Sequence, residues 1–403
     1  MNDSTRHAQQ ALEAVERVQR LYAAQRAACL AQPYPSADER LERLRALKRQ
    51  TQRYQDLLAE AMSTDFGFRP AAESKMLDLL GSVLEANHAI SHLKRWMKPS
   101  KRSTELLFLG NSVKVMYQPK GVVGVIVPWN FPIYLAMGPL VTALAAGNRV
   151  MIKMSEVTPA TNAVFKTLLG EVFGEELVAV VGEELADPNV FTSLPFDHIV
   201  FTGSPAVGKI VMRTAAQNLT PVTLELGGKS PAVVTRHYPV ADAALRITHG
   251  KSVNCGQICI APDYALVPRE SVDAFVASVK SSFEQFYGGR TEGNPNFTSV
   301  VSDRQLQRIE AVLADARAKG ATVTACAPQP SAGNRQLPLH IVTGATPDME
   351  VLKQELFGPV LPVVPYDSTD DAIRFINERP RPLALYCFSH DDTERDELLR
   401  RTH

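Results

Sequence analysis

Runs of apolar residues alternate with amphipathic stretches through the middle of the chain. Continuous Val and Ile runs are typical of strands that are buried on both faces, and their alternation with helices predicts a parallel sheet covered on both sides. We therefore predict a doubly wound α/β domain. Its expected strands are GVVGVIV, RVMIK, VAVV, HIVF and VTLEL, and its expected helices span residues 132–146, 159–173 and 206–216.

The segments on either side of this domain follow other patterns. The first hundred residues predict helices, because Ser36 and Glu39 form a capping box and apolar residues keep helical spacing from Met76 to Leu93. LLFL (106–109), a Gly-Asn turn and SVKVMYQ (112–118) predict a two-stranded hairpin. A second α/β unit is expected after the sheet, with strands at PAVV, YALV, ATVTA, LPVVPY and LALYCF.

The numbers of charged residues argue against nucleic acid as a binding partner. Lys and Arg together number 43 and so do Asp and Glu, so the chain lacks the cationic excess that nucleic-acid binding requires. Residues 121–148 carry no charge, but prolines and an Asn within them interrupt any membrane-spanning helix. The five cysteines are too few to cross-link a chain of this size, and the N-terminus has no signal-peptide pattern. We expect a cytoplasmic protein with free thiols.

Two residues are candidates for covalent chemistry. Glu225 lies near the end of VTLEL, on a strand expected to be buried, where desolvation would make its carboxylate a stronger base. A structural carboxylate that caps the next turn fits the pattern as well. Cys259 in NCGQICIAPDY could be a nucleophile beside backbone N–H groups, or an inert core thiol. Cys255 and Cys259 lack further ligands at suitable spacing, so we predict no metal site.

Polar residues also follow other expected strands. Asn130, held between prolines, could donate a hydrogen bond to an oxyanion or satisfy the backbone of a turn. Lys153 and Glu156 could bind ribose hydroxyls or form a solvated ion pair. FTGSPAVG matches neither a P-loop nor the usual dinucleotide fingerprint, so it is a weak signal for an anion at a helix N-terminus. The residues concerned there are Gly203, Ser204 and Gly208.

Six motifs taken together carry a family resemblance. PWNFP, KMSE, FTGSPAVG, LELGGKSP, GQICIAPDY and QELFGP occur in an order and at intervals that resemble the aldehyde dehydrogenase superfamily, from about Leu21 to the last residue. The GQxCxAPDY form is similar to class 3 enzymes, which include fatty-aldehyde dehydrogenases. The sequences of the segments WMKP, YQPKGVVG and RPRPLALYCF most resemble those of the bacterial coniferyl aldehyde dehydrogenases.

The resemblance implies roles for these residues. It assigns the catalytic thiol to Cys259, the general base to Glu225 and the oxyanion amide to Asn130. It also implies NAD as cofactor, with NADP as a second possibility that Glu156 mildly disfavours by repelling a 2′-phosphate. The implied cofactor-binding residues are Lys153 and Glu156 for the adenosine ribose, Gly203, Ser204 and Gly208 for the pyrophosphate, Glu355 and Phe357 for the nicotinamide ribose and ring, and Leu226.

The resemblance also implies a domain plan. Residues 1–103 and 119–224 would form the dinucleotide-binding domain, 104–118 an oligomerisation hairpin and 225–403 the catalytic domain. Relatives continue beyond the position of His403 with a segment that closes the catalytic domain and takes part in subunit pairing. We therefore expect a catalytic domain truncated at its C-terminus, and a homodimer where that segment is present.

Two residues near the thiol differ from the family pattern. Ile258 stands where Thr is common, and Cys255 stands where Ala is usual. If both cysteines lie on one helix, their i,i+4 spacing would allow a reversible disulfide between Cys255 and Cys259.

The predicted activity is NAD(P)-dependent oxidation of an aldehyde to a carboxylic acid through a thiohemiacetal and a thioester on Cys259, with coniferyl aldehyde converted to ferulate. Three alternatives remain at this point: a medium- or long-chain aliphatic aldehyde dehydrogenase, a thiol enzyme such as a thioesterase that needs no nucleotide, and an inactive truncated homologue that acts as a pairing protein. No nucleic acid or membrane partner is expected.

Overall fold

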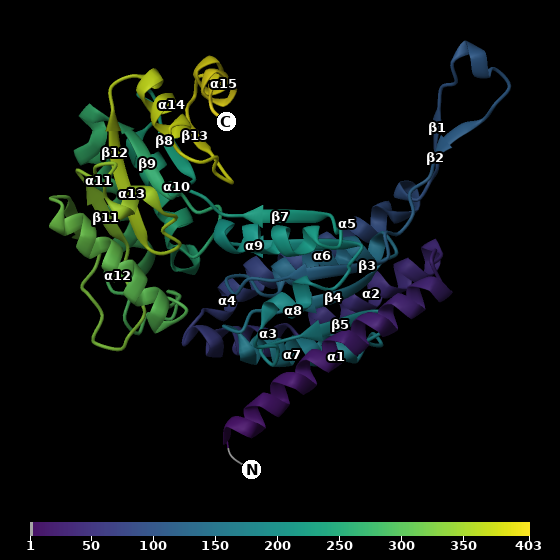
Figure 1. Cartoon of the computed structure of the whole chain (residues 1–403). Coiled ribbons are helices and arrows are strands. Elements are labelled where there is room, and N and C mark those ends of the chain that lie inside the picture. Colours follow the sequence, from purple (N-terminus) through teal and green to yellow (C-terminus); the bar gives the residue numbers. More distant parts are fainter. Residues whose placement is uncertain (1–2) are drawn as a thin grey trace. The chain divides into compact units, whose positions relative to one another are not determined.

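The computed structural model describes residues 3–403, which divide into two compact units (Figure 1). The first unit comprises the chain up to Asp65 together with Ser74–Glu225, and the second comprises Phe66–Glu73 and Leu226–His403. Each unit has its own sheet and its own hydrophobic core.

The sheet of the first unit has five strands in the order β5-β4-β3-β6-β7. The pairs β3–β4, β4–β5 and β3–β6 are parallel. The chain adds β4 and β5 on one side of β3 and then crosses over to add β6 and β7 on the other side, so the strand order reverses between β3 and β6. This confirms the doubly wound prediction. The strands are β3 (Val122–Ile126), β4 (Arg149–Lys153), β5 (Val178–Val181), β6 (His198–Gly203) and β7 (Val222–Leu226).

Helices connect these strands as the alternating pattern predicts. The capping box of Ser36 and Glu39 begins α2, and the buried side chains of Leu44 and Leu140 belong to the same core as the sheet. The connecting helices are α6 (Tyr134–Ala145), α7 (Pro159–Gly170), α8 (Pro188–Thr192) and α9 (Pro205–Ala216). The preceding ones are α1 (Asp3–Ala31), α2 (Ala37–Arg53), α3 (Gln55–Phe66), the short α4 (Ala71–Ser74) and α5 (Gly81–Trp96).

The apolar residues that begin at Met76 do not all face the core. Lys75–Leu80 forms a π-helical turn ahead of α5, and Met76, Leu80 and Leu84 are exposed. The buried face is made by other residues, among them Leu79 and Leu93. The periodicity therefore predicted the helix correctly but not which of its apolar residues are buried.

The uncharged run 121–148 forms β3, α6 and the turn between them. Buried residues line it throughout, so its lack of charge reflects a protein core. Across residues 3–403, no helix combines the length and the apolar character needed to cross a membrane.

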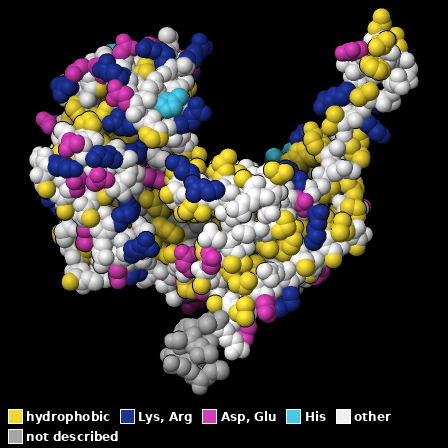
Figure 2. Space-filling model, in the orientation of Figure 1, with side chains coloured by type: hydrophobic (Ala, Val, Ile, Leu, Met, Phe, Trp, Pro, Cys, Tyr) yellow, Lys and Arg dark blue, Asp and Glu magenta, His cyan; other side chains and the backbone are white. Residues whose placement is uncertain are grey.

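A hairpin extends from the first unit, with β1 (Ser100–Arg102) paired antiparallel to β2 (Val113–Val115) (Figure 1). The predicted strand at LLFL is wrong, because Leu106–Phe108 forms a 3-10 turn at the tip. The tip contacts no sheet that could bury an alternating face. Its side chains are therefore exposed, at 84% for Leu106 and 86% for Leu107, and they form a hydrophobic group at the end of the hairpin (Figure 2).

The second unit contains a six-stranded sheet in the order β10-β11-β12-β9-β8-β13, in which only the β10–β11 pair is antiparallel. The sequence pattern did not predict β11. The strands are β8 (Pro231–Val234), β9 (Tyr264–Pro268), β10 (Thr322–Ala325), β11 (His340–Thr343), β12 (Val360–Tyr366) and β13 (Tyr386–Phe388). The helices are α10 (Val240–Ser252), α11 (Val272–Tyr287), α12 (Asp303–Ala318), α13 (Glu350–Lys353), α14 (Thr369–Asn377) and α15 (Asp392–Arg401).

The chain reverses sharply after α10. Asn254, Cys255 and Gly256 all have positive φ, at 50°, 55° and 71°. Asn and Gly tolerate this left-handed region, whereas for Cys it costs energy that the surroundings must offset. Gly256 is also required by space, because a Cβ there would lie 2.5 Å from the carbonyl oxygen of Gly358. The loop that leads to Cys259 is therefore held in an unusual conformation.

The amide side chain of Gln257 fixes this loop. Its Nε2 donates to the carbonyl oxygens of Asn254 (2.9 Å) and Ser299 (3.1 Å), and its Oε1 accepts from the N–H of Val301 (2.9 Å). Gln257 is fully buried, so water cannot replace these hydrogen bonds.

We expect the substitution Gln257→Ala to lower the free energy of unfolding by about 3 kcal/mol, because three hydrogen bonds are lost and their backbone partners stay buried. Urea denaturation monitored by circular dichroism measures this change. Gln285→Ala, at an exposed position of α11, is the matched control and should change the stability by less than about 0.5 kcal/mol. Equal stabilities for the two variants would contradict the role of Gln257.

Candidate active site

The candidate residues of the first unit gather at one edge of its sheet. Ile126 at the end of β3 is paired with Lys153 of β4 and with Phe201 of β6. The carboxyl ends of these three strands therefore lie side by side, at the point where the strand order reverses. In open α/β sheets this is where ligands bind.

Asn130 lies in the turn between β3 and α6 and is 2% exposed. The buried carboxylate of Asp78 fixes the end of that turn, since its Oδ1 accepts from the N–H groups of Ile133 (3.1 Å) and Tyr134 (3.0 Å). Negative charge at the first turn of α6 is favourable for the helix dipole. Sequence reasoning missed Asp78, because it comes from a distant helical segment with no motif of its own.

Lys153 is buried at the end of β4, where its Nζ donates to the carbonyl oxygen of Met154 (2.7 Å). Burial lowers the pKa of Lys153, and the exposed carboxylate of Glu156 opposes this shift. One hydrogen bond leaves an ammonium with further donor capacity. Lys153 can therefore donate to a ligand hydroxyl at the sheet edge.

The motif FTGSPAVG ends β6 and begins α9. Ser204 is the N-cap of this twelve-residue helix, and its Oγ accepts from the N–H of Val207 (3.4 Å). Gly203 is the last residue of β6. Gly208 offers no free N–H, since its amide donates to the carbonyl oxygen of Ser204 (2.9 Å), so our expectation that its backbone faces an anion is wrong. It contributes a buried position without a side chain.

Glu225 does not lie on a buried strand, as we had expected. β7 is the edge strand of the five-stranded sheet, and Glu225 is exposed together with Thr223, whereas Leu224 is half-buried. The predicted alternation of side chains is present, but the burial on which the base chemistry was argued is not. An exposed carboxylate has direct access to water. Leu226, the next residue, is half-buried at the end of the strand.

Cys259 is half-buried in a turn that follows the loop fixed by Gln257. Cys255 differs from it, because it is fully buried in the core with its Sγ directed at the carbonyl oxygen of Leu337 (3.7 Å), and burial raises the pKa of its thiol. The premise of the disulfide hypothesis is wrong. Residues 254 and 255 are not α-helical, so the i,i+4 geometry of a helix does not apply to the two thiols.

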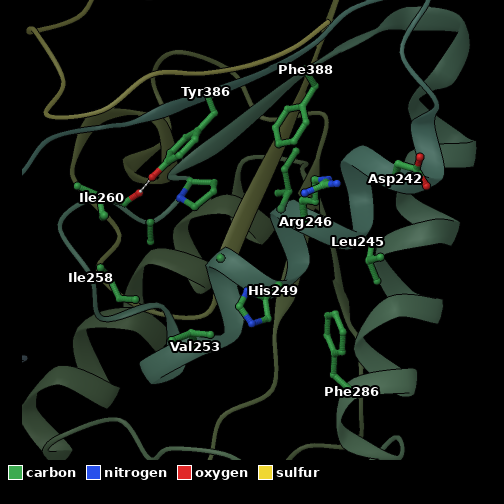
Figure 3. Close-up of a pocket in the computed structure, with 14 residues that line it drawn as sticks. Asp242, Leu245, Arg246, His249, Val253, Ile258, Ile260, Phe286, Tyr386 and Phe388 are labelled. Carbon is green, nitrogen blue, oxygen red and sulfur yellow. Dashed lines mark hydrogen bonds between the residues drawn. The ribbon is translucent and has the colours of Figure 1, made fainter. Parts of the chain in front are cut away.

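An apolar groove lies beside the Cys259 turn. Its volume is about 830 Å³, and both neighbours of the cysteine, Ile258 and Ile260, contribute to its lining (Figure 3). In Figure 3 the ring of Phe286 on α11 lies near His249 on α10, and the two rings are in edge-to-face contact with centroids 5.9 Å apart. A groove of this size and composition fits an aromatic or long apolar ligand.

Tyr386 on β13 holds the same turn. Its hydroxyl donates to the carbonyl oxygen of Ile260 (Figure 3). Burial raises the pKa of Tyr386, and the nearby Cys259 adds to the shift, which places the phenol within electrostatic reach of the thiol. Sequence reasoning did not select Tyr386, although it lies in the RPRPLALYCF segment that contributed to the family resemblance.

Glu355 and Phe357 form the second candidate group of this unit. Oε1 of Glu355 is buried and has no hydrogen-bond partner among residues 3–403. Burial raises the pKa of Glu355 to about 7, and the Asp263 carboxylate contributes to the increase. A Cβ on Gly227 would lie 2.3 Å from this carboxylate, so the glycine leaves the space that Glu355 occupies. Phe357 is half-buried with a left-handed backbone at φ 43°.

Comparison with known proteins identifies the family to which the chain is similar. A model of the aldehyde dehydrogenase family matches residues 3–403. A protein of Pseudomonas aeruginosa named "Probable coniferyl aldehyde dehydrogenase" is 48% identical over 396 residues, which are 98% of this chain and 82% of that protein. The coniferyl aldehyde dehydrogenase of Pseudomonas sp. (strain HR199 / DSM 7063) is 43% identical over 352 residues, 86% of this chain and 72% of that protein.

A solved structure supports the same relationship. The aldehyde dehydrogenase of Mycobacterium tuberculosis complexed with NAD+ superposes with a TM-score of 0.85 at 28% identity, covering 96% of this chain and 81% of that one. The predicted resemblance and fold are confirmed, and so is the interpretation as an aldehyde dehydrogenase. The chain belongs to the aldehyde dehydrogenase family.

Proposed function

We propose that the protein oxidises an aldehyde to its carboxylic acid through covalent catalysis by Cys259. The observation that carries this proposal is the position of the thiol, half-buried on a rigid loop and flanked by two residues that line an apolar groove. A nucleophile in such a place can meet the carbonyl carbon of an apolar substrate while its own conformation is fixed.

The chain's residues would divide the reaction as follows. The thiolate of Cys259 attacks the aldehyde carbon, and the resulting thiohemiacetal oxyanion accepts hydrogen bonds from the Asn130 amide and the Cys259 N–H. Loss of hydride leaves a thioester. Glu225 then takes a proton from a water molecule, and the hydroxide adds to the thioester, releasing the acid and regenerating the thiol. The exposure of Glu225 suits it to this water-activating step.

The donor and acceptor groups fit a nicotinamide dinucleotide. The unpartnered Oε1 of Glu355 can accept a hydrogen bond from a ribose hydroxyl, and Lys153 with Glu156 can hold the second ribose. Gly203 and Ser204 at the start of α9 suit a pyrophosphate, with Gly208 behind them, while Leu226 and Phe357 supply apolar contacts. When bound, the nicotinamide supplies the acceptor for the hydride. We propose NAD, with NADP as a second possible cofactor.

We propose coniferyl aldehyde as the substrate and ferulate as the product. Two similar proteins carry the name coniferyl aldehyde dehydrogenase. The aromatic lining of the groove, which includes Phe286, Tyr386 and Phe388, supports a planar aromatic aldehyde.

We also propose that the protein forms a homodimer through the β1–β2 hairpin. Its tip exposes four consecutive apolar side chains at 106–109, and such a cluster is costly to leave in water. β1 and β2 form a sheet of two strands, so the outer edge of each strand has no neighbouring strand in the described residues 3–403. All five cysteines are free, which supports a location in the reducing cytoplasm.

The covalent mechanism predicts that two substitutions block different steps of the reaction. Cys259→Ala should lower aldehyde-dependent NADH formation by roughly 1,000-fold or more, because the nucleophile is gone. Glu225→Gln should give a burst of one NADH per enzyme and then a steady rate about 100-fold below wild type, because hydrolysis of the thioester stalls. Stopped-flow absorbance resolves burst and steady state. Cys29→Ala is the control with wild-type turnover, and normal turnover of Cys259→Ala would end the assignment.

The groove predicts substrate preference. We expect kcat/KM for coniferyl aldehyde to exceed that for decanal by about tenfold or more, and Phe286→Ala to lower the coniferyl value by about tenfold, because apolar contact is lost. Turnover of acetaldehyde, which is too small to fill the groove, serves as the control and should be unchanged. A higher kcat/KM for decanal would instead assign the protein to aliphatic aldehydes.

The hairpin predicts the oligomeric state. Sedimentation equilibrium should show a dimer for the wild type, and the double substitution Leu106→Ser with Leu107→Ser should raise the dimer dissociation constant at least about tenfold, because apolar contacts at the tip are lost. Leu57→Ser, at a similarly exposed position of α3, is the matched control. A dimer of unchanged affinity in the double variant would place the interface elsewhere.

A further inference from the structure

Two buried lysines, one half-buried arginine and one buried carboxylate lie at and beside the backbone of residues 351–356. Lys229 is 8% exposed, and its Nζ uses all three of its donors: to Oδ2 of Asp263, to the carbonyl oxygen of Val351 (3.0 Å) and to that of Gln354 (3.0 Å). This lysine therefore contacts the end of α13 and the residue immediately before Glu355.

Asp263 completes the contact from the other side. Its Oδ1 accepts from the N–H of Leu356 (3.0 Å), the residue immediately after Glu355. The same Oδ1 lies 3.5 Å from Nζ of Lys251, which is fully buried on α10. One carboxylate thus forms ion pairs with two buried ammonium groups and holds a backbone amide at the same time.

A third side chain, Arg308 on α12, reaches the remaining carbonyl oxygens. Nη1 of Arg308 donates to the carbonyl oxygen of Glu355 (3.4 Å), and Nη2 donates to that of Leu356. The backbone on both sides of Glu355 is therefore held by charged groups from three separate elements, although Glu355 itself leaves its Oε1 unpartnered.

We propose that Asp263 is a positioning residue for the cofactor, which fixes the 354–356 backbone so that the Glu355 carboxylate is presented to a ribose hydroxyl. The proposal rests on the proposed function, in which Glu355 binds the nicotinamide ribose. Asp263 does not touch the cofactor itself. It acts by holding Leu356 directly and by orienting Lys229 toward Val351 and Gln354.

Asp263 also contributes to the charge state of Glu355, since burial raises the pKa of Glu355 to about 7 and the Asp263 carboxylate adds to this increase. The groups that act on this carboxylate are Asp263, which favours its neutral form, and Lys229, Lys251 and the Gly228 N–H, which favour its ionised form. Arg308, on α12, interacts with it as well. Only the ionised form accepts hydrogen bonds with both oxygens, so the affinity for NAD should increase as the pH rises through about 7. Replacing Asp263 with a neutral residue removes the repulsion and should move this midpoint to lower pH.

The experiment measures NAD binding to the purified chain by isothermal titration calorimetry between pH 6 and pH 8, so that no turnover is required. Asp263→Asn should raise the dissociation constant about tenfold, because the contacts that hold the backbone are weakened, and should shift the pH midpoint downward. A purely structural loss would weaken binding without moving the midpoint. Asp315→Asn is the matched control, since Asp315 accepts from the N–H of Glu350 (2.8 Å) at the other end of α13, and it should leave both quantities unchanged.

Hydrogen exchange of the backbone amides provides a second test of the proposal, and this measurement needs no cofactor. The amide of Leu356 should exchange about tenfold faster in Asp263→Asn than in the wild type, because its acceptor is weakened. If circular dichroism shows that Asp263→Asn does not fold, Arg308→Met carries the test. It should fold and raise the dissociation constant for NAD severalfold, with Arg304→Met on the exposed face of α12 as its control.

Two outcomes overturn the proposal: wild-type affinity and pH midpoint in folded Asp263→Asn, or wild-type affinity in Arg308→Met. Glu355→Gln separates this failure from a failure of the proposed function. If Glu355→Gln binds NAD like the wild type, the ribose-binding role of Glu355 is wrong. If Glu355→Gln weakens binding while the Asp263 and Arg308 variants do not, only the positioning role is wrong.

Discussion

A buried negative charge shared between two lysines organises the second unit. Removing an ammonium or a carboxylate from water costs several kcal/mol, and the cost is offset only where the charges are paired and hydrogen-bonded. Asp263 meets this condition for Lys229, which is hydrogen-bonded to it, and it also forms an ion pair with Lys251 at 3.5 Å. Because the two lysines come from separate elements, the position of each element is coupled to the other through one carboxylate. Exchanging Asp263 for an apolar residue would leave two ammonium groups in the interior without this carboxylate.

The loops that carry the candidate residues Asn130 and Cys259 are fixed by side chains rather than by the sheets. A parallel sheet aligns the ends of its strands but leaves the following turns without backbone partners. Asp78 supplies partners for the turn after Asn130, and Gln257 supplies them for the loop before Cys259. In both cases a buried polar side chain takes the place that a neighbouring strand would have. The two candidate residues therefore lie in or beside irregular segments whose backbone is held by buried side-chain hydrogen bonds.

The sequence predicted most of the regular structure because continuous Val and Ile runs leave few alternatives for a strand. β4, β5, β7 and β8 begin and end where the pattern placed them. The exposure of Glu225 could not be predicted in this way, since it depends on β7 being the edge strand, and strand order is a long-range property. The same holds for the hairpin tip at Leu106, whose apolar residues matched a strand but have no sheet to pair with.

Motifs in the sequence identified the candidate site residues but not the side chains that hold their segments in place. The residues that hold these segments make their contacts far away in sequence, and none of them lies in a sequence motif that identifies this role. They are Asp78, Asp263, Arg308 and Tyr386. Cys255 shows the opposite problem. Its spacing from Cys259 suggested a helix, yet Asn254 and Cys255 adopt left-handed backbone conformations, and one thiol points into the core while the other stays half-exposed. The loop thus gives two chemically identical side chains different surroundings. Burial among apolar groups favours the neutral form of the Cys255 thiol, and a neutral thiol is a poor nucleophile.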